Sequence, residues 1–310
     1  MMRSNPDQWF KVLCGLLLAA GESALAFEAP ECRTLELEAY SYSGPAIYDQ
    51  GLLWKLTGKA SRPSYLFGTI HVTDSEILDL PAPVTEALAG SSIFVMETLP
   101  DIGQLSALSE LLFFQDGRSL RQMISQPLFE RTGEILRDYY LPSEAVASMK
   151  PWAAFLTMNY PPGAGTVLDE MLMNLAVGYG ASVHGLESMQ EQLDIFDDLP
   201  LENQVTLLAD TVCHYEVIID DIATMKSMYL ARDLKGLYEY SNRYSYRDDP
   251  VYEELMNNLL TRRNHVMVER MLPHLEAGNA FIAIGAMHLP GDEGILNLLR
   301  ERGYELIPVY

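Results

Sequence analysis

The stretch YLFGTIH at residues 65–71 decides the fold of this chain, and AFIAIGAMH at residues 280–288 repeats its plan. In each stretch an apolar strand runs into a Gly-x-x-His step, which ends at His71 or at His288. A proline-bearing loop, an amphipathic segment and a further apolar run then follow. Two units of strand, Gly-x-x-His, helix and strand predict an α/β fold with parallel crossovers.

The histidines of the two units are candidate functional residues because of where they lie. Functional groups in such sheets collect where strands end and loops begin, and His71 and His288 both follow a buried-type strand. Gly68 and Gly285 lack a Cβ, which allows tight packing or an unusual backbone at each bend. A single Gly-x-x-His is a weak motif, and a lone histidine is usually structural. Two histidines in matching contexts favour a shared function.

Two carboxylates occupy comparable positions. Glu97 ends the apolar run 92–97, and Glu187 follows the predicted strand 181–186, itself preceded by a predicted helix over 166–177. A charge at such a place is costly unless it is paired or bound to a cation. Two histidines with one or two carboxylates suit a divalent metal ion, whose bound water would be acidified, with a spare carboxylate as general base. The alternative for each glutamate is a salt bridge with a nearby arginine.

The N-terminus has the order of a secretory signal peptide. A positively charged start precedes the apolar run 12–21, which is too short for a bilayer-spanning helix of about 20 residues. A small-x-small site ends at Ala26. We therefore predict a signal peptide over residues 1–26, cleaved after Ala26, and export to the periplasm or the extracellular space. The alternative is a buried N-terminal helix. The mature chain is expected to contain no transmembrane segment.

Export changes the meaning of the cysteines. Cleavage leaves Cys32 and Cys213, and an even pair in an oxidising compartment favours a disulfide. This bridge would close a very long loop, which is the favourable case in the entropic model. The alternative is two unrelated thiols. Neither cysteine lies in a C-x-x-C motif.

Composition narrows the functional classes. The chain has 310 residues, 48% of them hydrophobic and 21% charged, as expected of a globular protein. Its formal net charge of −22 repels phosphate backbones, so nucleic-acid binding is excluded and a neutral or cationic substrate is favoured.

The middle of the chain is predicted to be a helical insertion over residues 100–275 of an α/β domain that spans 50–310, with 27–49 as an N-terminal extension. Helices are expected over 202–223 and 250–275, and tyrosines between residues 238 and 252 lie where the two meet. These tyrosines either bind a flat ligand such as haem or pack in core and loops. Arg262 and Arg263 lie in the last predicted helix. They either face a carboxylate in the site or in a substrate, or lie on a solvated face of the helix.

At these residues the sequence resembles the TraB/PrgY/GumN family, within the wider Tiki superfamily. The resemblance covers residues 50–310 and leaves out the N-terminal segment. The matching stretches are LWKL at 53–56, YLFGTIHV at 65–72, FVME at 94–97, GLES at 185–188, Gln192, Arg263 with Asn264, and residues 281–291.

The resemblance implies an α/β fold with an inserted helical region, related to the erythromycin-esterase and ChaN-like folds. Animal Tiki proteins are regarded as metal-dependent proteases that use the two Gly-x-x-His motifs and a glutamate. When this motif is transferred to the present sequence, the resemblance implies that His71, His288 and Glu97 are metal ligands. Glu187, Arg263 and Asn264 match family positions with less settled roles.

Three hypotheses follow. The first is an exported metal-dependent hydrolase, most plausibly a peptidase, that uses Mn²⁺, Co²⁺ or Zn²⁺; Glu187 positions or deprotonates water, and Arg263 holds a substrate carboxylate or oxyanion. The second is a non-catalytic protein that sequesters a peptide or a haem-like ligand. The third is a metal-free esterase with a histidine as general base. The oligomeric state is not predicted, and no Gly-x-Ser-x-Gly elbow supports a serine hydrolase of that type.

Overall fold

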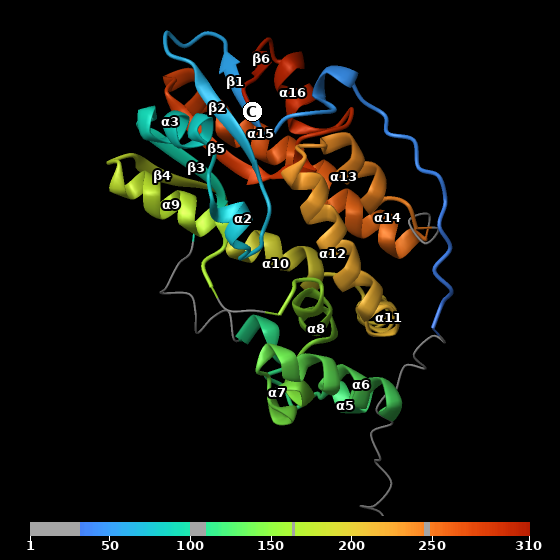
Figure 1. Ribbon diagram of the computed structural model, residues 1–310. Coiled ribbons are helices and arrows are strands. Elements are labelled where there is room, and N and C mark those ends of the chain that lie inside the picture. Colours follow the sequence, from blue (N-terminus) through green and yellow to red (C-terminus); the bar gives the residue numbers. More distant parts are fainter. Residues whose placement is uncertain (1–31, 100–109, 163–164, 245–248) are drawn as a thin grey trace, which may run out of the picture.

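The computed structural model describes residues 32–99, 110–162, 165–244 and 249–310 (Figure 1). It confirms the α/β class, with one mixed six-stranded sheet and many helices. The predicted signal peptide lies outside the described residues. Within the described ranges, none of the helices combines the length and the apolar character that crossing a bilayer requires.

The sheet has the strand order β4-β3-β5-β2-β1-β6. Neighbours among β2, β3, β4 and β5 pair in parallel, whereas β1 is antiparallel to both β2 and β6. The carboxyl ends of four adjacent strands therefore lie along the same edge of the sheet. The strands are β1 (Leu53–Thr57), β2 (Ser64–Thr69), β3 (Ile93–Thr98), β4 (Ser182–Glu187), β5 (Ala280–Gly285) and β6 (Glu305–Pro308).

Helices cover the sheet on both faces. Residues 280–284 of the central strand β5 are all buried, as expected of a parallel strand with packing on each side. Helices α3 and α9 pack against each other and α9 contacts β3 and β4, while α15 contacts β3, β4, β5 and α16. The helices around the sheet are α2 (Ser75–Leu78), α3 (Ala82–Gly90), α9 (Leu168–Gly178), α15 (Arg263–Ala277) and α16 (Ile295–Glu301).

A second hydrophobic core lies in the helical region. It is built around Trp152 and Phe196, whose rings stack with centroids 5.9 Å apart. Figure 1 shows these helices below the sheet, so the molecule has a sheet part and a helical part. The helices are α5 (Leu120–Met123), α6 (Gln126–Leu136), α7 (Ser143–Ser148), α8 (Pro151–Met158), α10 (Met189–Asp197) and α11 (Leu201–Cys213).

Two predicted helices differ in detail. The helix expected over 202–223 is interrupted at His214, which separates α11 from α12 (Tyr215–Leu230); its ring donates to the carbonyl of Arg33, a tertiary contact that local sequence does not encode. The helix expected over 250–275 is α14 (Pro250–Met256), then a π-helical segment (Asn257–Arg262), then α15.

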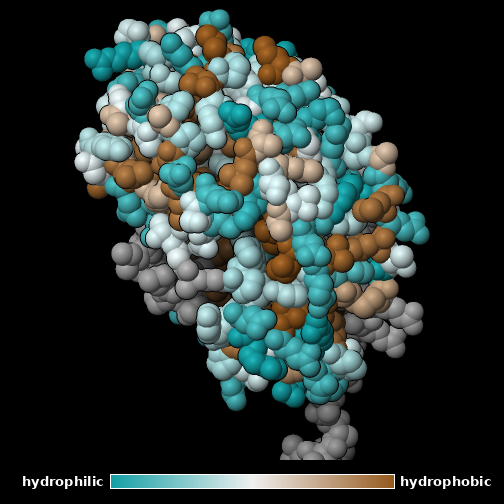
Figure 2. Space-filling model, in the orientation of Figure 1, coloured by the Kyte–Doolittle hydropathy of each residue, from teal (hydrophilic) through white to brown (hydrophobic). Residues whose placement is uncertain are grey.

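The N-terminal segment over residues 32–44, which we call the strap, runs along one side of the molecule (Figure 1). The predicted disulfide between Cys32 and Cys213 is confirmed, with Cα atoms 5.6 Å apart. Beyond it the strap reaches α13 (Leu234–Ser241). Much of the face seen in Figure 2 is hydrophilic, with apolar side chains in separate small groups, as on most soluble domains.

Candidate active site

The edge formed by the strand ends brings the predicted site residues together. Each of the four parallel strands carries at least one of them at or just beyond its carboxyl end. They are His71 after β2, Glu97 in β3, Glu187 at the end of β4, and Gly285 with His288 after β5, where His288 ends a 3-10 turn (Ala286–His288).

Gly285 is the point on which three of these residues converge. A Cβ added there would lie 3.2 Å from Oε1 of Glu97, 3.5 Å from Cδ2 of His288 and 3.9 Å from Nε2 of His71. Gly285 has a negative φ of −49°, so its lack of a side chain serves close approach. Gly68 likewise packs tightly against the segment that follows β5. Of the two options that the sequence left open for these glycines, tight packing is confirmed.

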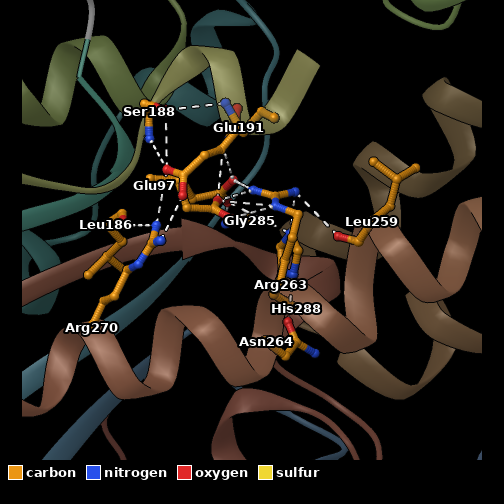
Figure 3. A network of polar contacts seen from close by, with 12 residues as sticks. Glu97, Leu186, Ser188, Glu191, Leu259, Arg263, Asn264, Arg270, Gly285 and His288 are labelled. Atoms are coloured by element: carbon orange, nitrogen blue, oxygen red, sulfur yellow. Dashed lines mark hydrogen bonds and ion pairs between the residues drawn. The ribbon is translucent and has the colours of Figure 1, made fainter. Parts of the chain in front are cut away.

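Arg263, the first residue of α15, lies at the centre of the cluster (Figure 3). Its NH2 atom is 2.5 Å from Oε2 of Glu97 and 2.8 Å from Oε2 of Glu187. Its Nε donates to Glu187 as well, and NH1 lies 3.3 Å from Nε2 of His288. Gln192 of α10 donates to both glutamates. The salt-bridge alternative is therefore confirmed for Glu97 and Glu187, which share one arginine.

His288 is held by Asn264, the next residue of α15. Its Nδ1 lies 2.7 Å from Oδ1 of Asn264, whose amide nitrogen donates to the carbonyl of Glu293 at 2.8 Å. Since that second bond fixes the amide orientation, Nδ1 of His288 is the protonated nitrogen and its Nε2 faces the cluster, 4.0 Å from Glu97. Burial lowers the pKa of His288 to about 4; the charge of Glu97 opposes this shift and that of Arg263 supports it. His288 is therefore neutral at pH 7.

His71 is held by Asp169, a buried residue in the first turn of α9 that sequence reasoning missed. Its Nδ1 lies 2.8 Å from Oδ2 of Asp169, while Thr69 donates to Oδ1 at 2.6 Å. Desolvation lowers the pKa of His71, but the hydrogen bond and charge of Asp169 outweigh it and raise the pKa to about 9. The two histidines therefore hold opposite protonation states at pH 7.

The third charged group of the cluster is Glu97. Burial opposes its ionisation, but His288, Arg263 and His71 together lower its pKa to about 2. Its Oε1 also accepts a hydrogen bond from the backbone N–H of Gly285 at 2.7 Å. Glu97 is thus ionised beside a neutral imidazole and a protonated one, and such divergence is typical of sites with acid and base roles.

The side of the site nearest His71 is open and is flanked by the helical part. The side chain of His71 is 41% exposed, whereas that of His288 is 7% exposed. Tyr160, which follows α8, places its ring 6.4 Å from that of His71. Its carbonyl accepts a hydrogen bond from the hydroxyl of Tyr139 at 2.6 Å, which ties this residue to the second core. His71 is therefore much more accessible to a substrate than His288, on the side where Tyr160 lies.

The donor chemistry of the cluster suits a divalent ion, but its spacing is not that of a preformed site. Both histidines present Nε2 because Asp169 or Asn264 engages Nδ1, an arrangement found around many metal-bound histidines. Across the described residues, however, no group of three or more His, Cys, Asp or Glu side chains is placed to hold an ion. Arg263 also occupies Oε2 of Glu97. Binding would require side-chain shifts, displacement of Arg263 NH1 from Nε2 of His288, and loss of the His71 proton.

Replacing Asp169 with asparagine should lower the pKa of His71 well below about 9, because the charge of Asp169 is lost while desolvation and Arg263 still oppose protonation and only Glu97 favours it. The pKa of His71 is higher in the folded protein than in the unfolded chain. The His71–Asp169 pair therefore stabilises the fold fully below about pH 6.5, and this contribution is lost as the pH rises through about 9. In the variant this contribution should vanish. NMR titration of the histidine rings measures the pKa of His71 in the wild-type protein and in the variant. Asp79→Asn is the control, and an unchanged His71 titration in the Asp169 variant would refute this account.

The strand ends of this α/β sheet therefore gather two histidines in different protonation states, an ionised glutamate and a buried arginine. Among known families, the model of the TraB/PrgY/gumN family matches residues 52–308. The chain belongs to this family, as the sequence resemblance implied.

The relatives include animal and bacterial proteins. The chain is 25% identical to the metalloprotease TIKI2 of Danio rerio over 79% of its own length and 58% of the fish protein. It is 23% identical to human metalloprotease TIKI1, covering 97% and 69% of the two chains, and 21% identical to the uncharacterized protein YbaP of Shigella flexneri, covering 85% and 95%. The chain thus spans little more than half of TIKI2. No solved structure matches it, so kinship to erythromycin-esterase and ChaN-like folds stays a prediction.

Proposed function

We propose that this protein is an exported hydrolase of peptide bonds that acts at the strand-end cluster with a divalent ion. The observation that carries the proposal is the convergence of His71, Glu97 and His288 on Gly285. Two distant relatives named metalloproteases support the reaction class. The confirmed disulfide and the N-terminal sequence support export. The net charge of −22 favours a neutral or cationic peptide.

We assign the ion to Nε2 of His71, Nε2 of His288 and Oε1 of Glu97. Bound there, a divalent ion would polarise a carbonyl and acidify a water molecule. Asp169 and Asn264 keep the two imidazoles in the tautomer that presents Nε2.

The remaining groups hold the site together and face the substrate. Because Arg263 and Gln192 occupy the oxygens of Glu187, we now place Glu187 as the residue that fixes Arg263, in contrast to the role with water that the sequence suggested. The NH1 atom of Arg263 contacts the carbonyl of Leu259 and Nε2 of His288 but neither carboxylate. With Nε2 of His288 given to the ion, the N–H released from it is the donor that we assign to a developing oxyanion. Tyr160, whose ring lies 6.4 Å from that of His71, is the residue that we assign to contact with the substrate.

A metal-free hydrolase is the second candidate, and one observation favours it. The guanidinium of Arg263 already places a cation between Glu97 and His288. His71, protonated at neutral pH and more exposed than His288, would then donate a proton to the leaving group, with neutral His288 as base. The binding-protein hypothesis receives less support, because hydroxyls of the clustered tyrosines Tyr240, Tyr244 and Tyr252 are engaged by Asp221 or Asp210.

The deciding experiment is elemental analysis of the mature wild-type protein and of its His71→Ala/His288→Ala variant, after incubation with Mn²⁺, Co²⁺ or Zn²⁺. We expect about one ion per wild-type chain and none in the variant, since both imidazole ligands are lost. Cleavage of a peptide library should fall by at least about 10³-fold in the variant and be abolished by a chelator.

The matched control is His184→Ala/His274→Ala, because these two histidines contact each other with ring centroids 4.7 Å apart, outside the site. It should retain both the ion and the activity. Activity that survives chelation but not the His71→Ala/His288→Ala change would select the metal-free hydrolase. Activity that survives both would refute either form of the proposal, and binding of a peptide without cleavage would favour the sequestering protein.

A further inference from the structure

The strap over residues 32–44 lies outside the region that matches the family, which begins at residue 52. Its N-terminal end is fixed by the disulfide between Cys32 and Cys213. Next to it, Arg33 forms ion pairs with Asp210 and Asp249. A short stretch of covalent and ionic contacts thus fastens this end to the helical part of the molecule.

The middle of the strap is fastened to α13 and the residues that follow it. Leu37 forms an antiparallel bridge with Tyr244. The rings of Tyr40 and Tyr42 both pack against Tyr238, with centroids 6.0 and 5.8 Å away. The backbone N–H of Tyr42 also donates to the carboxylate of Glu239. These contacts fix where the next residues of the strap can lie.

The last residues of the strap bind the loop over residues 289–294, which directly follows His288. The N–H of Gly291 donates to the hydroxyl of Tyr42 at 3.0 Å, and the N–H of Asp292 donates to the carbonyl of Ser43 at 3.1 Å. Gly44 allows this approach, since a Cβ there would lie 3.0 Å from Cα of Gly291. Gly291 has φ +97°, a conformation that L side chains rarely adopt, so the loop depends on glycine at this contact.

The same loop is connected to the imidazole of His288. The carbonyl of Glu293 accepts from Nδ2 of Asn264 at 2.8 Å, and Oδ1 of Asn264 faces Nδ1 of His288 at 2.7 Å. A continuous set of hydrogen bonds therefore runs from Tyr42 and Ser43 through the loop to Asn264. Loss of the loop position would free the amide to rotate, and the tautomer of His288 would no longer be fixed.

We propose that the strap is a positioning element for His288, with Tyr42 and Ser43 holding the loop that orients Asn264. The proposal extends the proposed function, because His288 has to act in the reaction for its orientation to matter to turnover. Tyr42 touches neither the site nor the substrate, and it is a positioning residue. The N-terminal extension thereby supports the geometry of the site in this chain, although it lies outside the region that matches the family.

The test is Tyr42→Phe in the full mature protein, which removes the acceptor for Gly291 and keeps the ring against Tyr238. We expect amide exchange at Gly291 and Asp292 to quicken about fivefold, the equivalent of one ordinary hydrogen bond. The ¹⁵N signals of the His288 ring should shift from the single Nδ1–H tautomer to a mixture. Turnover of the peptide substrate should fall about tenfold in kcat with KM unchanged.

Ser41→Ala is the matched control, because it removes an exposed hydroxyl from the strap residue next to Tyr42. Gly44→Ala is a second test, since its methyl group would meet the Tyr42 hydroxyl and Gly291 and displace the strap. Wild-type exchange rates and ring signals in both Tyr42→Phe and Gly44→Ala would overturn the proposal. If the wild-type protein cleaves no peptide, these two NMR measurements still decide about the strap, and only the proposed function fails.

Discussion

Arg263→Met should lower the free energy of unfolding by about 3–5 kcal/mol at pH 7, because it leaves two buried carboxylates without their cation. The side chains of Arg263, Glu97 and Glu187 are only 13%, 12% and 5% exposed. Gln192 would still donate to both carboxylates, and Glu97 would keep the hydrogen bond from the Gly285 N–H. The melting temperature should fall by about 10 °C, measured by calorimetry or circular dichroism.

The pH dependence of this deficit has a definite sign. In the wild-type protein the lowered pKa of Glu97, about 2, stabilises the fold above the ordinary 4.5, and this contribution is lost as pH falls through about 2. Without the charge of Arg263 the carboxylate of Glu97 protonates more readily. The difference between variant and wild type should therefore shrink as pH falls below about 5.

Arg262→Met is the matched control, because Arg262 precedes Arg263 in the same helix and is exposed. It should change the stability by less than about 0.5 kcal/mol. Adding Glu97→Gln and Glu187→Gln to Arg263→Met should restore part of the loss, since the unpaired charges are removed. Equal stability of the two single arginine variants would show that the cluster does not depend on this ion pair.

Cys32→Ser/Cys213→Ser should cost about 2–5 kcal/mol of stability. The two cysteines are 181 residues apart, and closing a loop of this length is worth about 5 kcal/mol in the entropic account. Denaturant unfolding of the wild-type protein with and without a reductant, beside the variant, measures the effect. Reductant should lower the wild-type midpoint to that of the variant and leave the variant unchanged. A variant that unfolds at the wild-type midpoint would contradict this expectation.

Much of the site could be predicted because its residues share a local signature. His71, Glu97, Glu187 and His288 each lie at or beyond the end of an apolar run, and parallel strands bring such ends to one edge of a sheet. The apolar runs were sufficient to place β2, β3 and β5, because buried parallel strands are continuously hydrophobic, whereas the edge strand β4 is mostly exposed or half-buried.

Asp169 could not be found in the same way. An acidic residue in the first turn of a helix is ordinary, and its role depends on the packing of α9 beside β3 and β4. Nor does the sequence indicate that Arg263 forms ion pairs with both Glu97 and Glu187. It also does not indicate that the helix breaks at His214, whose ring donates a hydrogen bond to the strap. These features arise from contacts between segments far apart in the chain, which neither periodicity nor spacing records.

The π-helical turn before Arg263 has a consequence for comparing members of the family. A π turn holds one residue more than an α-helical turn, so deleting one position within residues 257–262 would restore regular winding. The π turn absorbs the extra residue by winding less per residue, so the residues on either side keep the faces that they would have in an unbroken α-helix. Arg263 would therefore still face the strand ends after such a deletion. Homologues that are one residue shorter here should keep their arginine opposite the strand ends, with a single alignment gap before it.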